Sequence, residues 1–245
     1  MDDSWYIHPT DFLSKLTLQD RQVFNRLGNK RLYCKDEMVF HVGSPSEDVF
    51  ILLDGRVKVY ELSKEGKEVI LWFCFPGELF GLSEICIGSG REVNAQACSN
   101  AEILAVKNND FEKYIRQNSH LALSAMQVLA YRLRQLSNAL LNLASDDVTV
   151  RVVKMLIRLS SRYGKSFENG ILLDIALTHQ ELADMVGASR QTVTTVLSML
   201  RKQNIIRMQQ RFIHILDTQW IESITGIVPV SWSLSSPPHM MKNTA

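Results

Sequence analysis

The stretch Thr178–Leu200 constrains the fold of this chain more than any other part of the sequence. Thr178 followed three residues later by Glu181 is a capping box, a pattern that starts an α-helix. The apolar positions that follow at helical spacing are Leu182, Met185 and Val186. Gly187 is expected to end this helix, because glycine adopts the left-handed conformation at little cost, and Ser189 can cap a second helix. The buried face of that second helix is expected to hold Val193, Val196, Leu197 and Leu200.

The second helix leaves a polar face whose side chains suit DNA. Residues of these types hydrogen-bond phosphates and base edges from the first turns of a recognition helix. They are Arg190, Gln191, Thr192, Thr194 and Thr195. An ordinary solvated helical hairpin is the alternative interpretation of this stretch.

The charge distribution favours nucleic-acid binding, although the net charge of +1 is uninformative as a total. Residues 1–145 hold 16 Lys/Arg and 18 Asp/Glu, whereas residues 146–217 hold 10 and 7. No acidic residue lies between Asp184 and Asp217, and the basic residues in that interval are Arg190, Arg201, Lys202, Arg207 and Arg211. A local basic field of this kind is typical of nucleic-acid binding, although it can also be a solvated face.

The region from about residue 31 to residue 107 has the pattern of an all-β domain. Short β-branched or aromatic runs are separated by turn signals, and Asp54-Gly55 between two such runs indicates a hairpin. The clearest runs are Val49–Leu53, Arg56–Leu62, Glu68–Phe75 and Glu102–Val106. The pattern predicts an antiparallel sandwich or barrel of about eight strands, preceded by a short helix over Leu13–Leu27.

A long helix is predicted from about Ser119 to Ala144, where there is no Pro or Gly. Its apolar residues alternate at spacings of three and four, as in the seam of a coiled coil. The seam consists of Met126, Leu129, Leu133, Leu136, Leu140 and Leu143. Leu123, Ala130 and Leu141 add a flanking strip, so we expect this strip to contact the β domain and the seam to contact a twin helix. The pattern favours a homodimer; one wide stripe lying on the β domain is the alternative.

The C-terminal region predicts a further helix, a strand and a β-ribbon. Asp147 can cap a helix over Val148–Tyr163, with Val152, Met155, Leu156 and Leu159 on its core face. A polar turn is expected at 165–169 and a strand at Ile171–Ile175. Beyond the two-helix stretch, Ile205–Met208 and Phe212–Leu216 flank a turn and predict a small wing. The tail over 220–245 is predicted to be poorly ordered, because from about Val228 it has Pro-Pro, a Ser cluster and no periodicity.

Several functional classes are disfavoured. No apolar run reaches membrane-spanning length, and the first residues lack the plan of a signal peptide, so we expect a cytoplasmic protein with no membrane partner. The widely spaced cysteines (Cys34, Cys74, Cys86 and Cys98) argue against a structural zinc site or a secreted disulfide framework. They are interpreted as small apolar residues, with a redox-sensing thiol as the alternative. No nucleophile–base grouping, phosphate-binding glycine loop or metal-ligand cluster is apparent, so neither an enzyme nor a metal site is predicted.

In this order the elements resemble the Crp/Fnr superfamily of bacterial transcription regulators. The resemblance covers roughly residues 20–217 and rests on five motifs: Gly43–Gly55, Val57–Tyr60, Phe75–Gly81, Leu177–Ala183 and Gly187–Val193. It implies an α+β fold: an N-terminal arm and antiparallel, jelly-roll-like β-roll over 1–118, a dimerisation helix over 119–145, a winged helix-turn-helix over 146–219 and a tail over 220–245. It also implies a homodimer that binds double-stranded DNA at a near-palindromic site and recruits or blocks RNA polymerase. A small-molecule effector in the β-roll would set the spacing of the recognition helices.

The residues that bind cyclic AMP in such regulators are only partly present. Family members use an arginine followed by Ser or Thr, a glutamate after a turn glycine, and a threonine from the dimer helix. Arg91 matches the arginine, but Glu92 replaces the hydroxyl residue. Leu82 replaces the glutamate and Leu136 the threonine, whereas Ser137 beside it is kept. A carboxylate at 92 would repel a cyclic phosphate, and the leucines would leave polar ligand groups unpaired. Cyclic AMP is therefore not expected.

The remaining effector pocket is expected to have apolar walls and Arg91 as an anion handle. The candidate wall residues are Leu71, Phe73, Phe80, Leu82, Leu133 and Leu136. Such a pocket suggests a less polar effector, a haem, or no small ligand. Conceivable haem or redox ligands are Cys74, Cys86, His8, His41 and His120, although a structural role is the favoured interpretation of each. Ile87–Ala97 is closer to the Fnr-like branch, but the chain has no N-terminal cysteine cluster for an iron–sulfur site.

The resemblance also assigns roles within the recognition helix. Arg190 is expected to read guanine, because its fork fits O6 and N7 in the major groove. Gln191 stands where relatives often have glutamate, and Thr195 where many have a second arginine. Thr178, His179 and Thr192 are expected to contact phosphates. Ser189, Thr194 and Arg211 complete the predicted DNA-binding set. The alternative function is a ligand-binding module that acts on a protein partner rather than on DNA.

Overall fold

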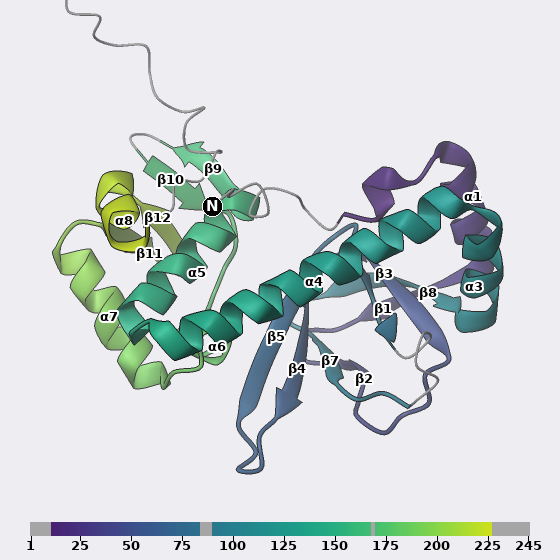
Figure 1. Ribbon diagram of the computed structural model, residues 1–245, viewed down its shortest axis with the longest axis horizontal. Helices are drawn as coiled ribbons and strands as arrows, with labels where there is room; N and C mark the ends of the chain where they lie inside the picture. Colours follow the sequence, from purple (N-terminus) through teal and green to yellow (C-terminus); the bar gives the residue numbers. More distant parts are fainter. Residues whose placement is uncertain (1–10, 84–89, 168–169, 227–245) are drawn as a thin grey trace, which may run out of the picture. The chain divides into compact units, whose positions relative to one another are not determined.

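The computed structural model describes residues 11–83, 90–167 and 170–226 (Figure 1). They form two compact units, which divide between residues 140 and 141. The long helix α4 (Ser119–Ser145) begins in the first unit and ends in the second. In the part of the chain that is described, no helix combines the length and apolar character needed to cross a lipid bilayer.

The first unit is built around two four-stranded antiparallel sheets. A 3-10 turn, Leu13–Lys15, and helix α1 (Leu18–Leu27) precede them. The strands are β1 (Gly28–Tyr33), β2 (Met38–Phe40), β3 (Asp48–Asp54), β4 (Val57–Leu62), β5 (Glu68–Cys74), β6 (Leu79–Phe80), β7 (Asn94–Ala97) and β8 (Ala101–Lys107). One sheet has the order β1-β8-β3-β6 and the other β2-β7-β4-β5. The predicted antiparallel roll is confirmed, and the four clearest runs match β3, β4, β5 and β8 to within one residue.

Alternation along the strands creates two apolar cores. In β3, Phe50 and Leu52 face the interior of the roll, where both sheets contribute, while Val49 and Ile51 face outward. Successive strand residues point to opposite faces, so one strand supplies both cores. The outer core is covered by residues of α1, α3 (Asn108–Gln117) and α4. These helices therefore cover the outer face of the sheet that contains β3.

The face of α4 that packs in the first unit differs from the predicted one. Its buried residues are Leu121, Ser124, Ala125, Val128 and Arg132. The predicted contact strip is wrong, because Leu123 and Ala130 are exposed there and Leu141 is exposed in the second unit. A helix turns about 100° per residue, so positions two residues from the buried row lie on nearly the opposite side. Sequence periodicity identified an apolar strip but not which side meets the sheet.

A buried ion pair anchors α4 to the β-roll. Arg132 donates from Nη2 to Glu78 Oε2 at 2.8 Å, and both side chains are at least nine-tenths buried. The guanidinium also lies 5.2 Å from the ring centroid of Trp72, and Glu78 accepts from the Phe75 amide at 3.2 Å. Burying two charges is tolerated only when they are paired and hydrogen-bonded. This pair therefore holds the turn before β6 against the helix.

A second polar cluster joins α1 to α3 and α4. Asp20 is buried and accepts hydrogen bonds from Thr17 (Oγ1, 2.6 Å) and Tyr114 (OH, 2.8 Å), and it lies 3.0 Å from His120 Nε2. Burial alone would raise the pKa of Asp20, but hydrogen bonds from Thr17, His120 and Tyr114 outweigh burial and hold the pKa well below its usual range. The ionised carboxylate therefore stabilises the contact of α1 with α3 and α4.

The second unit is a small α+β domain. Its elements are α5 (Val148–Tyr163), β9 (Gly164–Phe167), β10 (Gly170–Leu173), α6 (His179–Val186), α7 (Arg190–Lys202), β11 (Ile206–Gln209), β12 (Phe212–Ile215) and α8 (Thr218–Thr225). The antiparallel strands have the order β11-β12-β10-β9. Asp147 caps α5 by accepting from the Val150 amide, as predicted, and the four predicted core residues of α5 are buried.

Two predictions for this unit are wrong. The polar turn expected from residue 165 is in part β9, an edge strand whose residues are all exposed. An edge strand with both faces in solvent lacks the apolar alternation that would have indicated it. The tail expected from 220 begins too early, because α8 continues to Thr225, is capped by Asp217 and buries Ile221. The rest of the predicted tail, 227–245, lies outside the described residues.

Candidate functional site

Helices α6 and α7 form the two-helix unit that the caps predicted. Thr178 accepts from the Glu181 amide at 3.1 Å, and Glu181 in return accepts from the Thr178 amide at 2.7 Å. Gly187 ends α6 with a φ of 64°, in the left-handed region. Ser189 then caps α7 by accepting from the Thr192 amide at 3.0 Å. The sequence therefore folds locally into helix, tight turn and helix.

The first turns of α7 present the predicted polar face. The buried side consists of Val193, Val196, Leu197 and Leu200, as expected. The exposed side consists of Arg190, Gln191, Thr192 and Thr195. Thr194 differs from the prediction, because its half-buried hydroxyl donates to the Arg190 carbonyl and lies 2.8 Å from His179 Nδ1. Its polar atom is used inside the domain rather than presented for DNA.

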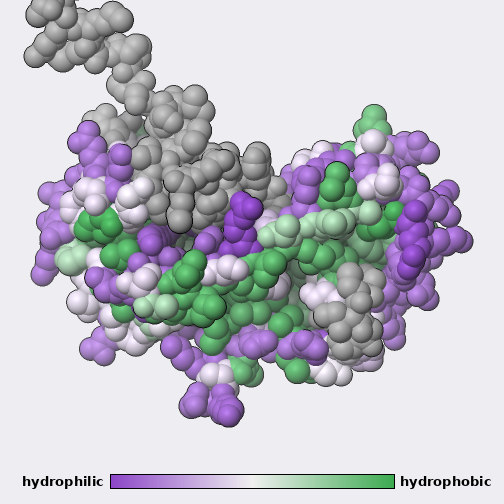
Figure 2. Space-filling view, in the orientation of Figure 1, coloured by the Kyte–Doolittle hydropathy of each residue, from purple (hydrophilic) through white to green (hydrophobic). Residues whose placement is uncertain are grey.

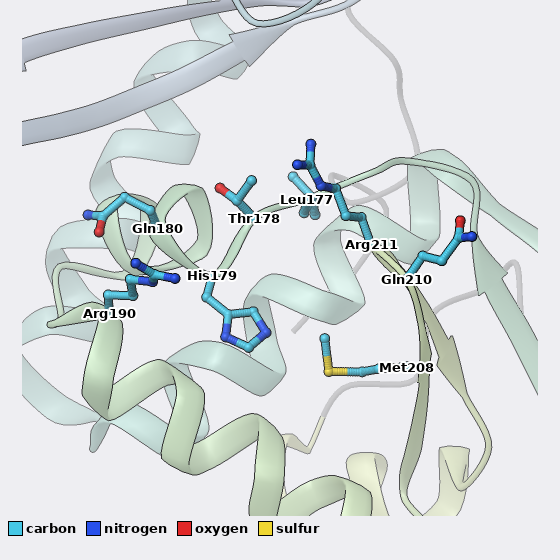
Figure 3. A pocket seen from close by; sticks show the side chains of 8 residues that line it. All are labelled: Leu177, Thr178, His179, Gln180, Arg190, Met208, Gln210 and Arg211. Atoms are coloured by element: carbon cyan, nitrogen blue, oxygen red, sulfur yellow. The ribbon is translucent and has the colours of Figure 1, made fainter.

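A pocket of about 470 Å³ opens where α6, α7 and the wing converge (Figure 3). Its lining consists of Leu177, Thr178, His179, Gln180, Arg190, Met208, Gln210 and Arg211. Two of these side chains are permanent cations and none is a carboxylate. A concave surface that combines cations, amides and the start of a helix suits an anion such as a backbone phosphate.

The structure brings four predicted DNA-binding residues, Thr178, His179, Arg190 and Arg211, to one pocket. Four further lining residues were not predicted to bind DNA: Leu177, Gln180, Met208 and Gln210. Gln210 has a φ of 55° and occupies the turn between the wing strands, which brings it back beside α6. The turn was visible in the sequence, but its return to α6 depends on the pairing of β12 with β10.

Both units match families of known proteins. Residues 30–118 match the model of the cyclic nucleotide-binding domain, and residues 150–224 match that of the Crp-like helix-turn-helix domain. The chain is 30% identical over 204 residues to the global nitrogen regulator of Synechocystis sp., with 79% of this chain and 91% of that protein covered. The chain belongs to the Crp/Fnr superfamily. It is therefore a DNA-binding transcription regulator rather than an enzyme.

Further similar proteins were found by sequence and by structure. A CRP-like cAMP-activated global transcriptional regulator of Mycobacterium tuberculosis is 29% identical over 181 residues, which cover 74% of this chain and 81% of that one. Among solved structures, a CooA mutant from Carboxydothermus hydrogenoformans has a TM-score of 0.77 and 25% identity, with 89% and 96% covered. The family-level prediction is confirmed.

In the cyclic nucleotide-binding domain of this Crp/Fnr member, Arg91 is turned into the protein. It is 3% exposed and donates from Nη1 to the Gly81 carbonyl at 3.1 Å and from Nη2 to the Asp48 carbonyl. Its guanidinium carbon Cζ lies over the rings of Phe40 and Phe50, at 4.3 and 5.4 Å from their centroids. Arg91, the predicted anion-binding residue, thus contacts backbone oxygens and aromatic rings of the protein itself.

The other predicted effector-pocket residues are spread over different surroundings. Phe80 stacks on Phe50 within the roll, with ring centroids 5.2 Å apart, and so lies beside Arg91. Leu82 is in the outer core under the helices instead. Phe73 is buried under the Arg56 guanidinium, and Leu71 is half-buried. Glu92, Leu133, Leu136 and Ser137 are exposed. Sequence position alone grouped residues that the fold assigns to different faces.

Of the conceivable haem or redox ligands, the three that the structure describes lie in different surroundings. Cys74 is buried in the roll, His41 is exposed and His120 pairs with Asp20. Cys86 and His8 lie outside the described residues. Among the residues that the structure does describe, no group of three or more His, Cys, Asp or Glu side chains could hold a metal ion.

The predicted seam of α4 is an exposed apolar band (Figure 2). The exposed fractions are 64% for Met126, 37% for Leu129, 68% for Leu133, 37% for Leu136, 69% for Leu140 and 52% for Leu143. Leu143 also contacts the helix-turn-helix, because its Cδ2 lies 3.0 Å from the position of a Cβ built on Gly187. A sustained row of exposed leucines on one helix is typical of an interface.

Proposed function

We propose that this protein is a homodimer that binds a near-palindromic DNA site through α7 and the wing, gated by a signal other than cyclic AMP. The observation that carries the proposal is the convergence of Arg190, His179 and Arg211 beside the exposed polar turns of α7. Base-reading side chains next to a cationic pocket that can receive a backbone phosphate are what readout of a major groove requires.

The dimer follows from the seam of α4. Six residues at spacings of three and four remain exposed in the single chain, Met126 to Leu143, and pairing them with a second copy would remove that apolar surface from water. The twofold axis of such a pair would present two recognition helices to successive major grooves.

The proposed signal differs from cyclic AMP because the phosphate-binding arginine is already engaged. A cyclic phosphate would have to draw Arg91 away from two carbonyls and two aromatic rings, while the exposed carboxylate of Glu92 repels it. A signal that acts on the roll would shift the arrangement of α4 and thereby of the DNA-binding domains. Contact with RNA polymerase and a cytoplasmic location follow from this role.

The test of DNA reading is base-resolved affinity. DNA sites would be selected from a random pool with the full chain, and every base of the selected site would then be substituted in turn. Arg190→Ala should lose about 1–3 kcal/mol of binding free energy at one base position, and its preference at the other positions should be unchanged. The control is Lys202→Ala, an exposed cation at the far end of α7. A uniform loss of affinity over all sequences would show that Arg190 contacts only phosphate. If no DNA site is selected from the pool, the proposal is refuted.

The test of the signal uses the purified full chain under anaerobic conditions. Absorption spectroscopy and native mass spectrometry would distinguish a haem, a retained small ligand and an empty protein. Titration with cyclic AMP should leave DNA affinity unchanged. Tight cyclic AMP binding that is lost in Arg91→Ala would contradict the assignment of Arg91 to a structural role.

A further inference from the structure

The imidazole of His179 has one nitrogen committed within the domain. Nδ1 lies 2.8 Å from the Thr194 hydroxyl, and that hydroxyl donates to the Arg190 carbonyl at 2.8 Å. A hydroxyl carries a single proton, so when it donates to Arg190 its oxygen can only accept from His179. The chain of hydrogen bonds therefore places a proton on Nδ1. It also fixes the ring relative to the first turn of α7.

The other nitrogen, Nε2, is directed into the pocket, toward the side where Met208 lies (Figure 3). In a neutral ring with its proton on Nδ1, Nε2 carries a lone pair and repels a phosphate oxygen. After it takes up a proton, the same atom becomes a charged donor that binds a phosphate oxygen strongly. The chemistry of this position thus depends on the charge of the ring.

The charged groups that line the pocket around the His179 ring favour an anion, whichever element they come from. Arg190 faces the pocket from α7 and Arg211 from the wing turn. On α6 itself, Glu181 is bound to Thr178 in the capping box, and Asp184 accepts from Gln180 at 2.7 Å. Among the eight lining residues, His179 is the one whose side chain type titrates near neutral pH.

We infer that His179 binds a DNA phosphate only as an imidazolium, so that this regulator takes up a proton on binding DNA and binds more tightly as pH falls. The inference rests on the proposed DNA-binding function and adds a pH control to it. A bound phosphate favours the protonated ring, and by linkage the protonated protein then favours the phosphate. One linked proton changes affinity by at most about tenfold per pH unit.

The experiment measures affinity of the full chain for a fluorescein-labelled 30-base-pair duplex of mixed sequence, by fluorescence anisotropy at constant ionic strength. Phosphate contacts dominate such binding, so no operator is needed. From pH 8 to pH 6 the wild type should gain about 3- to 10-fold through this site. His179→Asn, whose amide can still donate to Thr194, should bind more weakly at pH 6 and lose that gain. His179→Arg, a permanent cation, should bind well at both pH values without the gain.

The matched control is His41→Asn, the same change at an exposed histidine of the first unit, which should keep the wild-type dependence. Circular dichroism melting of each variant checks that the fold is kept. Equal pH dependence in wild type and both His179 variants would overturn this inference and leave the proposed function standing. Absence of wild-type binding at every pH would overturn both.

Discussion

The seam of α4 permits a quantitative test at Leu133, which is 68% exposed in the single chain. Full burial of a leucine side chain contributes roughly 2 kcal/mol, so covering this fraction contributes about 1.4 kcal/mol per copy. A symmetric dimer buries two copies. Leu133→Ala should therefore weaken the dimer by roughly 2 to 3 kcal/mol, or about 30- to 150-fold in dissociation constant. The fold should be unaffected, because Leu133 belongs to neither core of the first unit.

Sedimentation equilibrium over a range of protein concentrations measures this dissociation constant. The matched control is Leu32→Ala, the same substitution at a residue of β1 that is 81% exposed and does not belong to the seam. The control should dissociate like the wild type. If Leu133→Ala and Leu32→Ala dissociate alike, the seam is not the dimer interface and the reasoning from the exposed leucines fails.

Three further predictions concern stability. A carboxylate with a lowered pKa stabilises the fold above its unfolded pKa and loses that contribution as pH falls. Asp20→Asn should therefore lower the free energy of unfolding at pH 6, as measured by urea denaturation. The variant should also lose less stability than the wild type when the pH falls below about 4. Arg132→Met should lower the free energy of unfolding by about 3–5 kcal/mol, because Glu78 loses its buried ionic partner. An equal loss in Arg132→Lys would show that a positive charge alone does not stabilise the buried Glu78. Gly187→Ala should lower the melting temperature more than Gly226→Ala. Both glycines have a left-handed φ, but only a Cβ at 187 would meet a neighbouring side chain, that of Leu143. Equal shifts in melting temperature would show that the contact with Leu143 does not matter.

Short-range patterns predicted the elements of this protein well. The capping box at Thr178, the glycine at 187 and the cap at Ser189 set the bounds of α6 and α7, because each signal acts over three or four residues. The uninterrupted length of α4 was likewise predicted from the absence of Gly and Pro, and the start of α5 from the cap at Asp147. Strand β9 was missed, since an exposed edge strand has no apolar alternation to detect.

Side-chain roles were predicted less well, because they depend on partners far away in the sequence. Arg91 looked like an anion handle until the fold placed the carbonyls of Gly81 and Asp48 around it. Thr194 looked available to DNA until α6 brought His179 against it. Both residues have the expected type at the expected position, but their polar atoms are already used.

The sequence by itself determined the family, the order of the elements and the apolar seam of α4, since periodicity, caps and turn residues are local properties of the chain. Only the tertiary structure decided which side of α4 meets the roll, where Leu82 packs and which hydrogen bonds occupy Arg91 and His179. Those outcomes depend on strand pairing and helix packing, which bring residues from distant parts of the sequence into contact.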